Sequence, residues 1–290
     1  MARNSAAQTA FGPMILVAPG QGEQAGHRLV DDDLAAQFLP TPTRWLVTAT
    51  PPKLMRRLMM AAMERDGPGL WANMVCRKRY VADKVVEAFD NIDAVVVLGA
   101  GLDTFAYRLA RKSDIPIFEV DQPVNIERKA AAVRRVLGEL PSSVRLVPLN
   151  FERDDVLKVL TGHGYRADSR TFFIWEAVTQ YLTADAVHAT LESLRPAASG
   201  SRLVFTYVRR DFIEGINFYG AKQLYRRFVQ RQHLWQFGLR PEEVAAFLDG
   251  HGWRLVEQLG PEEIVRRYIE PTGRDLTASQ VEWSAYAEKS

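Results

Sequence analysis

Glycines follow an apolar run in the first half of the chain. Val95 to Leu98 are four apolar residues, and Gly99, Ala100 and Gly101 come directly after them. Such a run is typical of a strand buried on both faces of a parallel sheet. Small residues in the turn that follows let a ligand lie against bare backbone. Because many tight turns contain GxG, the neighbouring residues must decide what this turn binds.

Two of those neighbours disfavour a phosphate ligand. Thr104 stands where the third glycine of a dinucleotide-binding GxGxxG motif would fall. Asp103 places a carboxylate near a helix N-terminus, where a pyrophosphate would otherwise interact with the helix dipole and the free N–H groups. The pair suits a positively charged ligand without phosphates, such as S-adenosylmethionine. The alternative is that Asp103 only caps an ordinary helix.

Two carboxylates follow the next apolar run. Glu119 and Asp121 lie about 20 residues beyond the glycine turn, where a carboxylate binds the ribose hydroxyls of an adenine nucleoside. The alternative is a pair of solvated acids in a loop.

Later strand ends supply an amide, an aromatic ring and another acid. Asn150 could bond an adenine edge while Phe151 covers its face. A turn residue followed by a core Phe explains these two residues equally well. Glu176 ends an apolar run and could face either a ligand or a neighbouring arginine.

Alternating apolar runs and helical patterns predict the sheet that positions these residues. Strands are expected near 95–98, 115–120, 144–149, 171–176, 202–208, 253–259 and 281–287, with helices between them. This rhythm is typical of a doubly wound, mostly parallel α/β sheet with right-handed crossovers. Its ligand should lie outside the carboxyl ends of the strands, at the point where strand order reverses.

The first ninety residues lack strand patterns. Helices are expected over 29–40, 51–67 and 70–89, so residues 1–90 are interpreted as a helical cap and 91–290 as the ligand-binding core. Aromatic and charged residues over about 209–240 predict a helical insertion that closes over the site. Trp71, Phe212, Phe218, Tyr219 and Trp235 in these segments suggest an apolar, aromatic second ligand.

Composition bounds the remaining possibilities. The chain has 290 residues and a net charge of +2. So small a positive charge does not indicate a nucleic-acid or membrane partner. Cys76 is the only cysteine, and the five histidines show no metal-binding spacing. The chain has neither an apolar run of about 18 residues nor a signal-peptide pattern at its start. We therefore expect a reduced cytoplasmic protein without metal; its oligomeric state stays open.

The motifs VVVLGAGLDTFAYRL, FEVDQP and FIWEAVTQYLT, in this order, resemble those of the leucine carboxyl methyltransferase family. Its bacterial branch includes polyketide O-methyltransferases similar to the tetracenomycin enzyme. The resemblance covers roughly residues 77–208 and implies a Rossmann-like class I methyltransferase fold with a seven-stranded sheet. It also implies S-adenosylmethionine as cofactor and S-adenosylhomocysteine as product.

The resemblance also implies roles for the residues around the turn. Gly99 and Gly101, with Asp103 beside them, would approach the methionine part of the cofactor. Asp121, with Glu119 nearby, would bind the ribose.

Further roles concern the adenine and the amino-acid end of the cofactor. Asn150 and Phe151 would hold the adenine, although the family usually has Asp at position 150. Arg77 resembles the arginine that pairs with the cofactor carboxylate, and Arg79 competes for that role. Glu176 matches an acid near the cofactor amino group, and the family has glycine where Ala177 follows it.

The expected reaction is methyl transfer to a carboxylate or hydroxyl of a small, largely apolar metabolite, polyketide-like and belonging to secondary metabolism. Tyr181 matches a tyrosine that lines the acceptor pocket. A carboxylate with a pKa near 4 needs no general base, whereas a phenol near 10 would recruit Tyr181 or Glu176. A protein C-terminal carboxylate is an alternative acceptor. A nicotinamide-dependent dehydrogenase, a non-catalytic cofactor-binding protein and a tRNA-modifying enzyme are alternatives from other classes.

Overall fold

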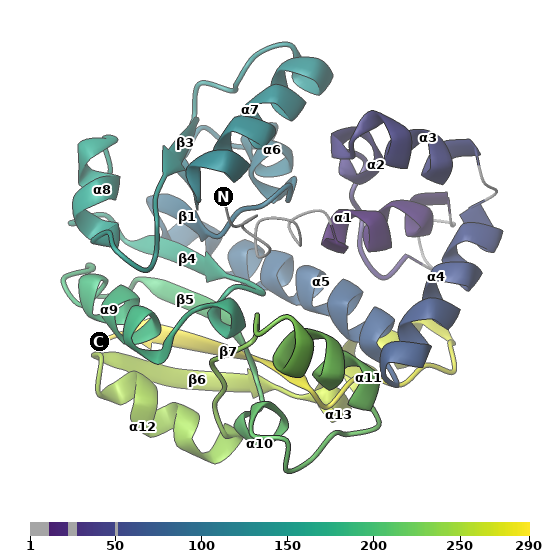
Figure 1. The fold of residues 1–290 in the computed structure, drawn as a ribbon. Coiled ribbons are helices and arrows are strands. Elements are labelled where there is room, and N and C mark those ends of the chain that lie inside the picture. Colours follow the sequence, from purple (N-terminus) through teal and green to yellow (C-terminus); the bar gives the residue numbers. More distant parts are fainter. Residues whose placement is uncertain (1–11, 23–27, 50–51) are drawn as a thin grey trace.

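The computed structural model describes residues 12–22, 28–49 and 52–290. Its centre is a seven-stranded sheet in the order β3-β2-β1-β4-β5-β7-β6 (Figure 1). The strands are β1 (Ala94–Leu98), β2 (Ile117–Asp121), β3 (Val144–Pro148), β4 (Thr171–Trp175), β5 (Arg202–Val208), β6 (Trp253–Leu259) and β7 (Glu282–Lys289). All pairs are parallel except those of β7, which runs antiparallel to both β5 and β6. The predicted doubly wound, mostly parallel sheet is confirmed.

The central strands are continuous apolar runs because helices cover both faces of the sheet. Every residue of β1, β2 and β4 is buried. Alternate residues of β1 point to opposite faces: Val95 and Val97 belong to one core cluster, and Val96 and Leu98 to the other. Strand order reverses between β1 and β4, so the carboxyl ends of these strands form the expected binding edge.

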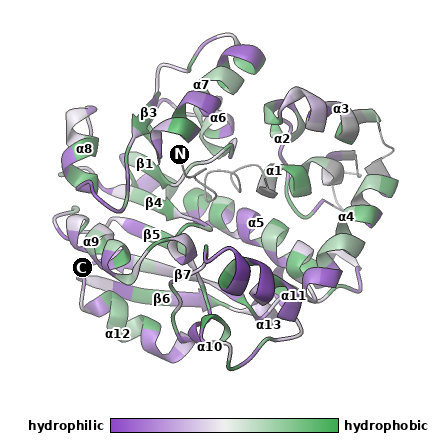
Figure 2. Cartoon of the chain, in the orientation of Figure 1, coloured by the Kyte–Doolittle hydropathy of each residue, from purple (hydrophilic) through white to green (hydrophobic). Residues whose placement is uncertain are grey.

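Helices complete the two outer layers. One face carries α5 (Leu70–Ala88), α6 (Phe105–Ala110), α7 (Pro123–Leu137) and α13 (Pro261–Ile264). The other carries α8 (Val156–Gly162), α9 (Ala184–Ser193) and α12 (Val244–Asp249). The Thr183 hydroxyl caps α9 by accepting a hydrogen bond from Ala186 N. Figure 2 shows hydrophobic and hydrophilic residues on α7 and α12, as a half-buried helix requires.

The N-terminal part is helical and gathers on one side of the molecule (Figure 1). It contains α1 (Gly12–Val17), η2 (Ala18–Gly22), α2 (Ala35–Phe38), α3 (Thr41–Ala49) and α4 (Pro52–Asp66). The helix expected over 29–40 is reduced to α2, and α3 begins directly after Pro40. Proline disfavours the interior of a helix but is tolerated at its beginning. Pro40 therefore separates the end of α2 from the beginning of α3.

The segment expected to be an insertion forms short helices. It contains α10 (Arg210–Ile213), α11 (Lys222–Tyr225) and the π-helical turn η6 (Arg226–Arg231), and α11 packs against α4. The remaining short turns are η4 (Phe89–Asn91), η5 (Thr179–Tyr181), η7 (Pro241–Glu243), η8 (Val265–Ile269) and η9 (Glu270–Thr272). None of the helices in the described ranges has both the length and the apolar character needed to cross a bilayer. Helix α5 lies before residue 90 but packs on β4 and β5 of the sheet. The division of the chain into a cap over 1–90 and a core over 91–290 stays a prediction.

Candidate functional site

The turn between β1 and α6 needs glycine at two positions. Gly99 has φ 76° and Gly101 has φ 48°, in the left-handed region that glycine enters most readily. A Cβ on Gly99 would also overlap Val178 Cγ2, the side chain of the loop after β4. Gly99 is therefore required both by its backbone conformation and by the close approach of Val178, where the carboxyl ends of β1 and β4 meet.

Asp121 ends β2 beside this turn. Its Oδ2 accepts a hydrogen bond from Gly101 N at 2.6 Å. Its Oδ1 accepts from Gln122 N at 2.6 Å and from Asn125 Nδ2 at 2.9 Å. A carboxylate offers about four lone-pair positions, so these three bonds leave Asp121 able to accept one more donor, such as a hydroxyl.

Thr104 explains why this chain lacks the third glycine of a dinucleotide motif. The residue is completely buried, and its hydroxyl donates to Asp32 Oδ2 at 2.6 Å. Asp32 belongs to the N-terminal part and is itself 2% exposed. A glycine at position 104 would leave the Asp32 oxygen without this donor. Position 104 therefore joins the turn to the N-terminal helices.

Asp103 interacts with the start of α6 and with a lysine of α5, and its role toward a ligand stays a prediction. Its Oδ1 accepts from Phe105 N at 2.6 Å, which forms an Asx turn just before α6, whose N-cap residue is Thr104. Its Oδ2 forms an ion pair with Lys78 of α5. Burial by itself would raise the pKa of the Asp103 carboxyl, but the charges of Lys78 and Lys129 outweigh burial and lower it.

Arg77 points into the site from α5. Its Nε donates to Glu176 Oε1 at 2.8 Å, and its Nη1 pairs with Glu282 of β7. Its Nη2 is buried without a hydrogen-bond partner. Arg79, by contrast, is 44% exposed and lies 3.8 Å from the Asp83 carboxylate. Arg77 is therefore the arginine that the structure places beside Glu176.

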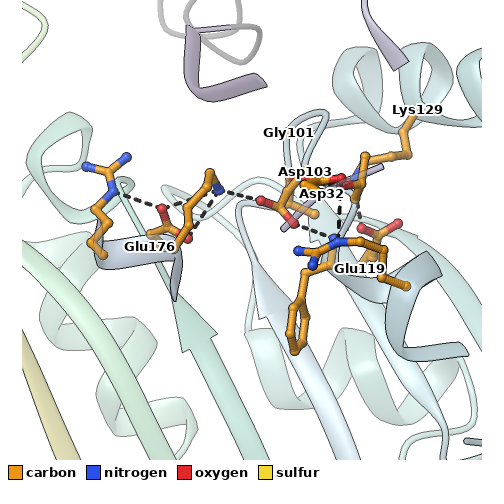
Figure 3. Close-up of polar contacts among 12 residues, drawn as sticks. Asp32, Gly101, Asp103, Glu119, Lys129 and Glu176 are labelled. Carbon is orange, nitrogen blue, oxygen red and sulfur yellow. Dashed lines mark hydrogen bonds and ion pairs between the residues drawn. The ribbon is translucent and has the colours of Figure 1, made fainter. Parts of the chain in front are cut away.

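Lys78 and Glu282 are site residues that the sequence did not reveal. The Lys78 ammonium lies between Asp103 and Glu176, 3.3 Å from Glu176 Oε1. Figure 3 shows Asp103 and Glu176 linked through this bridge. Burial opposes the charge on Lys78, but the two acids outweigh it and raise the lysine pKa. The basic run CRKRY was visible in the sequence, whereas only the antiparallel placement of β7 brings Glu282 to Arg77.

The backbone after Glu176 also has an unusual conformation. Ala177 has φ 60°, where an alanine is strained and glycine is not. Its N–H donates to Thr206 Oγ1 at 2.8 Å, and Thr206 donates in turn to Glu282 Oε1 at 3.0 Å. This chain of bonds holds the loop after β4 against β5 and β7.

Glu119 does not face the site, in contrast to the expectation of a second ribose acid. Its carboxylate is 1% exposed; Oε1 accepts from Lys129 Nζ at 2.6 Å and Oε2 accepts from the Tyr107 hydroxyl. Lys129 also donates to the Ala100 and Asp103 carbonyls, at 3.2 and 2.7 Å. Two residues along a strand correspond to about 6.6 Å, so Glu119 lies under the glycine turn and Asp121 at its rim. Figure 3 shows Glu119 and Lys129 beside Gly101.

Asn150 and Phe151 adopt the turn-and-core arrangement that was the alternative to adenine binding. Asn150 Oδ1 accepts from Glu152 N at 3.0 Å, which closes a local turn. Phe151 is 6% exposed and stacks on Trp175 at 6.5 Å. An adenine contact of this pair stays a prediction.

Aromatic residues gather beside Tyr181. The Tyr181 ring meets the Trp235 ring edge-on at 6.3 Å, and Trp235 stacks on Phe228 at 4.9 Å and approaches Phe212 at 6.2 Å. Two of the five aromatics expected to line a pocket, Phe212 and Trp235, therefore belong to this group.

Of the other three expected pocket aromatics, Tyr219 packs against the same apolar cluster as Phe212 and Trp235, and Phe218 contacts Tyr225 of that cluster. Trp71 is buried in the core cluster of the α5 face. Phe218 packs on Tyr225 at 4.9 Å, and the Tyr219 hydroxyl bonds Asp211. Over the described parts of the chain, no group of three or more His, Cys, Asp or Glu side chains converges as a metal site would.

Comparison with known proteins places this geometry in a family. The family model for leucine carboxyl methyltransferase matches residues 12–195. A Mycobacterium avium relative, provisionally named an S-adenosyl-L-methionine-dependent methyltransferase, is 31% identical over 204 residues, 66% of this chain and 61% of the relative. A Mycolicibacterium smegmatis relative with the same provisional name is 29% identical over 86% of this chain and 83% of its own length. The chain thus spans about three fifths of the first of these relatives.

Solved structures agree on the fold. A Thermobifida fusca protein, provisionally described as a methyltransferase, superimposes with a TM-score of 0.59 at 18% identity over 81% of this chain and 88% of its own. A DUF574 family protein from Streptomyces avermitilis gives a TM-score of 0.56 at 15% identity over 83% of this chain and 91% of its own. At these identities the likeness concerns the fold alone.

Proposed function

The chain belongs to the leucine carboxyl methyltransferase family, and on this premise we propose that it is an S-adenosylmethionine-dependent O-methyltransferase. The observation that carries the proposal is the buried Nη2 of Arg77, which has no partner although it lies on a guanidinium held by Glu176 and Glu282. A cationic donor beside carboxylates suits an amino acid, whose carboxylate would bind Arg77 and whose ammonium would bind Glu176.

The charge of the site supports the same ligand. Two cationic side chains, Arg77 and Lys78, meet three acids, Asp103, Glu176 and Glu282. The resulting negative balance suits a sulfonium nucleoside and opposes a pyrophosphate at the start of α6. The negative charge of the site therefore favours S-adenosylmethionine over a nicotinamide dinucleotide.

The bare backbone and Asp121 would hold the rest of the nucleoside. The methionine part would lie beside the turn over Gly99 and Gly101, and the free acceptor position of Asp121 suits a ribose hydroxyl. When bound, the cofactor supplies an electrophilic methyl group. The protein aligns the two reactants and excludes water, and such positioning can supply roughly 7 to 11 kcal/mol.

We propose a carboxylate of a small, largely apolar metabolite, polyketide-like in character, as the acceptor. The aromatic group around Tyr181 and Trp235 offers an apolar, ring-binding surface next to the loop that carries Glu176. A hydroxyl acceptor would need a base, but Glu176 is occupied by Arg77 and Lys78. A carboxylate is already ionised at neutral pH and needs none.

Calorimetry tests the cofactor assignment. We expect S-adenosylmethionine and S-adenosylhomocysteine to bind and NAD to give no heat. Asp121→Ala should weaken S-adenosylhomocysteine binding by about tenfold, the loss of a charge-assisted hydrogen bond. Asp168→Ala, which removes a fully exposed acid paired with Arg166, is the matched control and should leave the dissociation constant unchanged. Heat with NAD alone would overturn the assignment, and an unchanged constant in Asp121→Ala would overturn the ribose role.

Labelled cofactor tests the acceptor. The protein is incubated with methyl-labelled S-adenosylmethionine and either a metabolite extract or peptides with free C-terminal carboxylates. We expect an alkali-labile methyl ester in the metabolite fraction. Label on the peptides instead would identify a protein terminus as acceptor, and an alkali-stable ether would identify a hydroxyl.

A further inference from the structure

Lys78 lies where two positive groups would compete for one acid. Its ammonium is paired with Asp103, and it lies 3.3 Å from Glu176 Oε1 and 3.4 Å from Glu176 Oε2. The residue is 9% exposed, so little water screens these charges. Figure 3 shows the bridge between the two acids. The inference rests on the proposed function, in which Glu176 receives the ammonium of the cofactor.

The two contacts of Lys78 differ in strength. The contact with Asp103 is the shorter, and Asp103 is fixed by its bond to Phe105 N at 2.6 Å. The contact with Glu176 is longer, and Glu176 is held independently by Arg77 Nε at 2.8 Å. Lys78 can therefore release Glu176 while it keeps Asp103, and Glu176 does not depend on Lys78 for its position.

We propose that Lys78 is an internal counter-ion of Glu176 that the ammonium of the bound nucleoside displaces. Two ammonium groups on one carboxylate repel each other, so Lys78 lowers the affinity of the site for nucleosides that carry an amino acid. S-adenosylhomocysteine is one of them. Lys78 thus weakens retention of the product and sets how strongly the site distinguishes amino-acid-bearing nucleosides from simpler ones.

The arrangement favours this role over direct binding of the cofactor carboxylate by Lys78. Arg77 already offers a buried, unpaired donor for that carboxylate. The Lys78 ammonium, by contrast, is directed at two acids. The two roles predict opposite effects of removing the charge, because a carboxylate-binding lysine would strengthen S-adenosylhomocysteine binding and a competing lysine weakens it.

Calorimetric titration with two nucleosides tests the proposal. S-adenosylhomocysteine carries the amino acid, and 5′-methylthioadenosine lacks it. In Lys78→Met we expect S-adenosylhomocysteine to bind about three- to tenfold more tightly. The free energy that shifts a pKa by one unit corresponds to a tenfold change in a dissociation constant. The dissociation constant of 5′-methylthioadenosine should stay within about twofold of the wild-type value.

Three further variants make the test specific. Lys78→Gln keeps a donor toward Asp103 and should reproduce the effect even where Lys78→Met folds poorly. Lys78→Arg keeps the charge and should not reproduce the tighter binding of S-adenosylhomocysteine. Lys84→Met is the matched control: Lys84 is also a partly buried lysine of α5, 12% exposed, and pairs with Glu87 at 2.7 Å and Glu257 at 3.0 Å. It should change neither constant.

The outcomes separate this inference from the proposed function. Weaker or unchanged S-adenosylhomocysteine binding in folded Lys78→Gln, with 5′-methylthioadenosine unaffected, would overturn the role of Lys78 and leave the proposed function standing. Failure of the wild-type protein to bind either nucleoside would overturn the proposed function itself. Tighter binding of both nucleosides would also contradict the proposal, because a general change of the site would then explain the effect.

Discussion

At the scale of single residues, the arrangement around Arg77 decides how the site recognises charge. Two of its nitrogens are fixed by Glu176 and Glu282, and the third is buried and unpaired. Burial opposes its charge, but these acids outweigh burial and raise the pKa of the guanidinium. A guanidinium fixed on two sides presents its remaining donors in one direction, which favours binding of a planar anion.

Replacing this arginine should therefore affect ligands that carry a carboxylate. We expect Arg77→Met to weaken S-adenosylhomocysteine binding by at least about tenfold, the loss of a charge-assisted bond. Binding of 5′-methylthioadenosine reports whether the rest of the site is intact. Arg79→Met serves as control, since Arg79 is 44% exposed and pairs with Asp83. Calorimetry measures all three proteins, and equal losses in both arginine variants would contradict the assignment.

Asp103 makes stability depend on pH in a defined direction. Its pKa is lowered in the folded protein from the ordinary value of 3.8. Below that value the unfolded chain binds a proton that the folded chain does not, so the stabilisation by Asp103 is lost as pH falls through the folded-state pKa. Above about pH 5 it is fully present.

Asp103→Asn removes this dependence and keeps an acceptor for Phe105 N. We expect the free energy of unfolding, measured by urea titration, to fall less steeply between about pH 5 and 2 than in the wild type. A slope equal to that of the wild type would show that the carboxylate does not cause the dependence.

Sequence spacing identified which strand ends carry polar residues but not which of those residues are accessible. Glu119 and Asp121 stand two positions apart on one strand, and both were expected at the ribose. The structure separates them because Lys129, ten residues further along, supplies a buried partner for Glu119. That partner depends on how α7 packs on β2, which spacing alone does not encode. Asp121 remains at the rim, beside Gly101 N.

At the scale of elements, α5 and the helical insertion were both predictable, whereas the lengths of the insertion's helices were not. A long run of helix-forming residues with a buried stripe predicted a helix over 70–89, and α5 covers Leu70–Ala88. Residues 209–240 were expected to form an insertion of one or two helices, and they contain the short helices α10 and α11 together with the π-helical turn η6. Periodicity is informative only where one face of an element meets a continuous core.

Cys76 reports on the packing of α5. The thiol is completely buried, and burial raises its pKa to about 12. The thiolate is the reactive form, so the native protein should react with a thiol reagent at pH 8 only as fast as α5 detaches from the sheet. We expect stoichiometric labelling within minutes in strong denaturant and very slow labelling without it, followed by absorbance. Immediate labelling of the native protein would show that α5 opens freely.

At the scale of the whole molecule, the order of the strands creates the site. Parallel pairing and the reversal between β1 and β4 follow from the alternating pattern and were expected from it. The same pattern does not predict that β7 lies antiparallel between β5 and β6, yet this placement brings Glu282 to Arg77. The apolar runs predicted the seven strands of the sheet, whereas only the three-dimensional arrangement shows the partners of the charged residues at its edge.

The N-terminal helices are joined to the core by a buried polar contact at the glycine turn. Asp32 accepts from Thr104 Oγ1 at 2.6 Å and from Leu34 N at 3.1 Å, and Arg108 Nε lies 3.5 Å away. Thr104→Val keeps the shape of the side chain but leaves a buried acceptor without its donor, which costs about 1 to 3 kcal/mol. We expect urea unfolding to show this loss.

A double-mutant cycle with Asp32→Ala and Thr104→Val isolates the contact, because each single change removes one partner of the hydrogen bond. We expect a coupling free energy of about 1 kcal/mol or more between the two positions, measured as the departure of the double mutant from additivity. Additive losses would mean that Asp32 and Thr104 stabilise the protein independently. Coupling would show that the contact between Asp32 and Thr104 links the N-terminal part of the chain to the turn proposed to hold the cofactor.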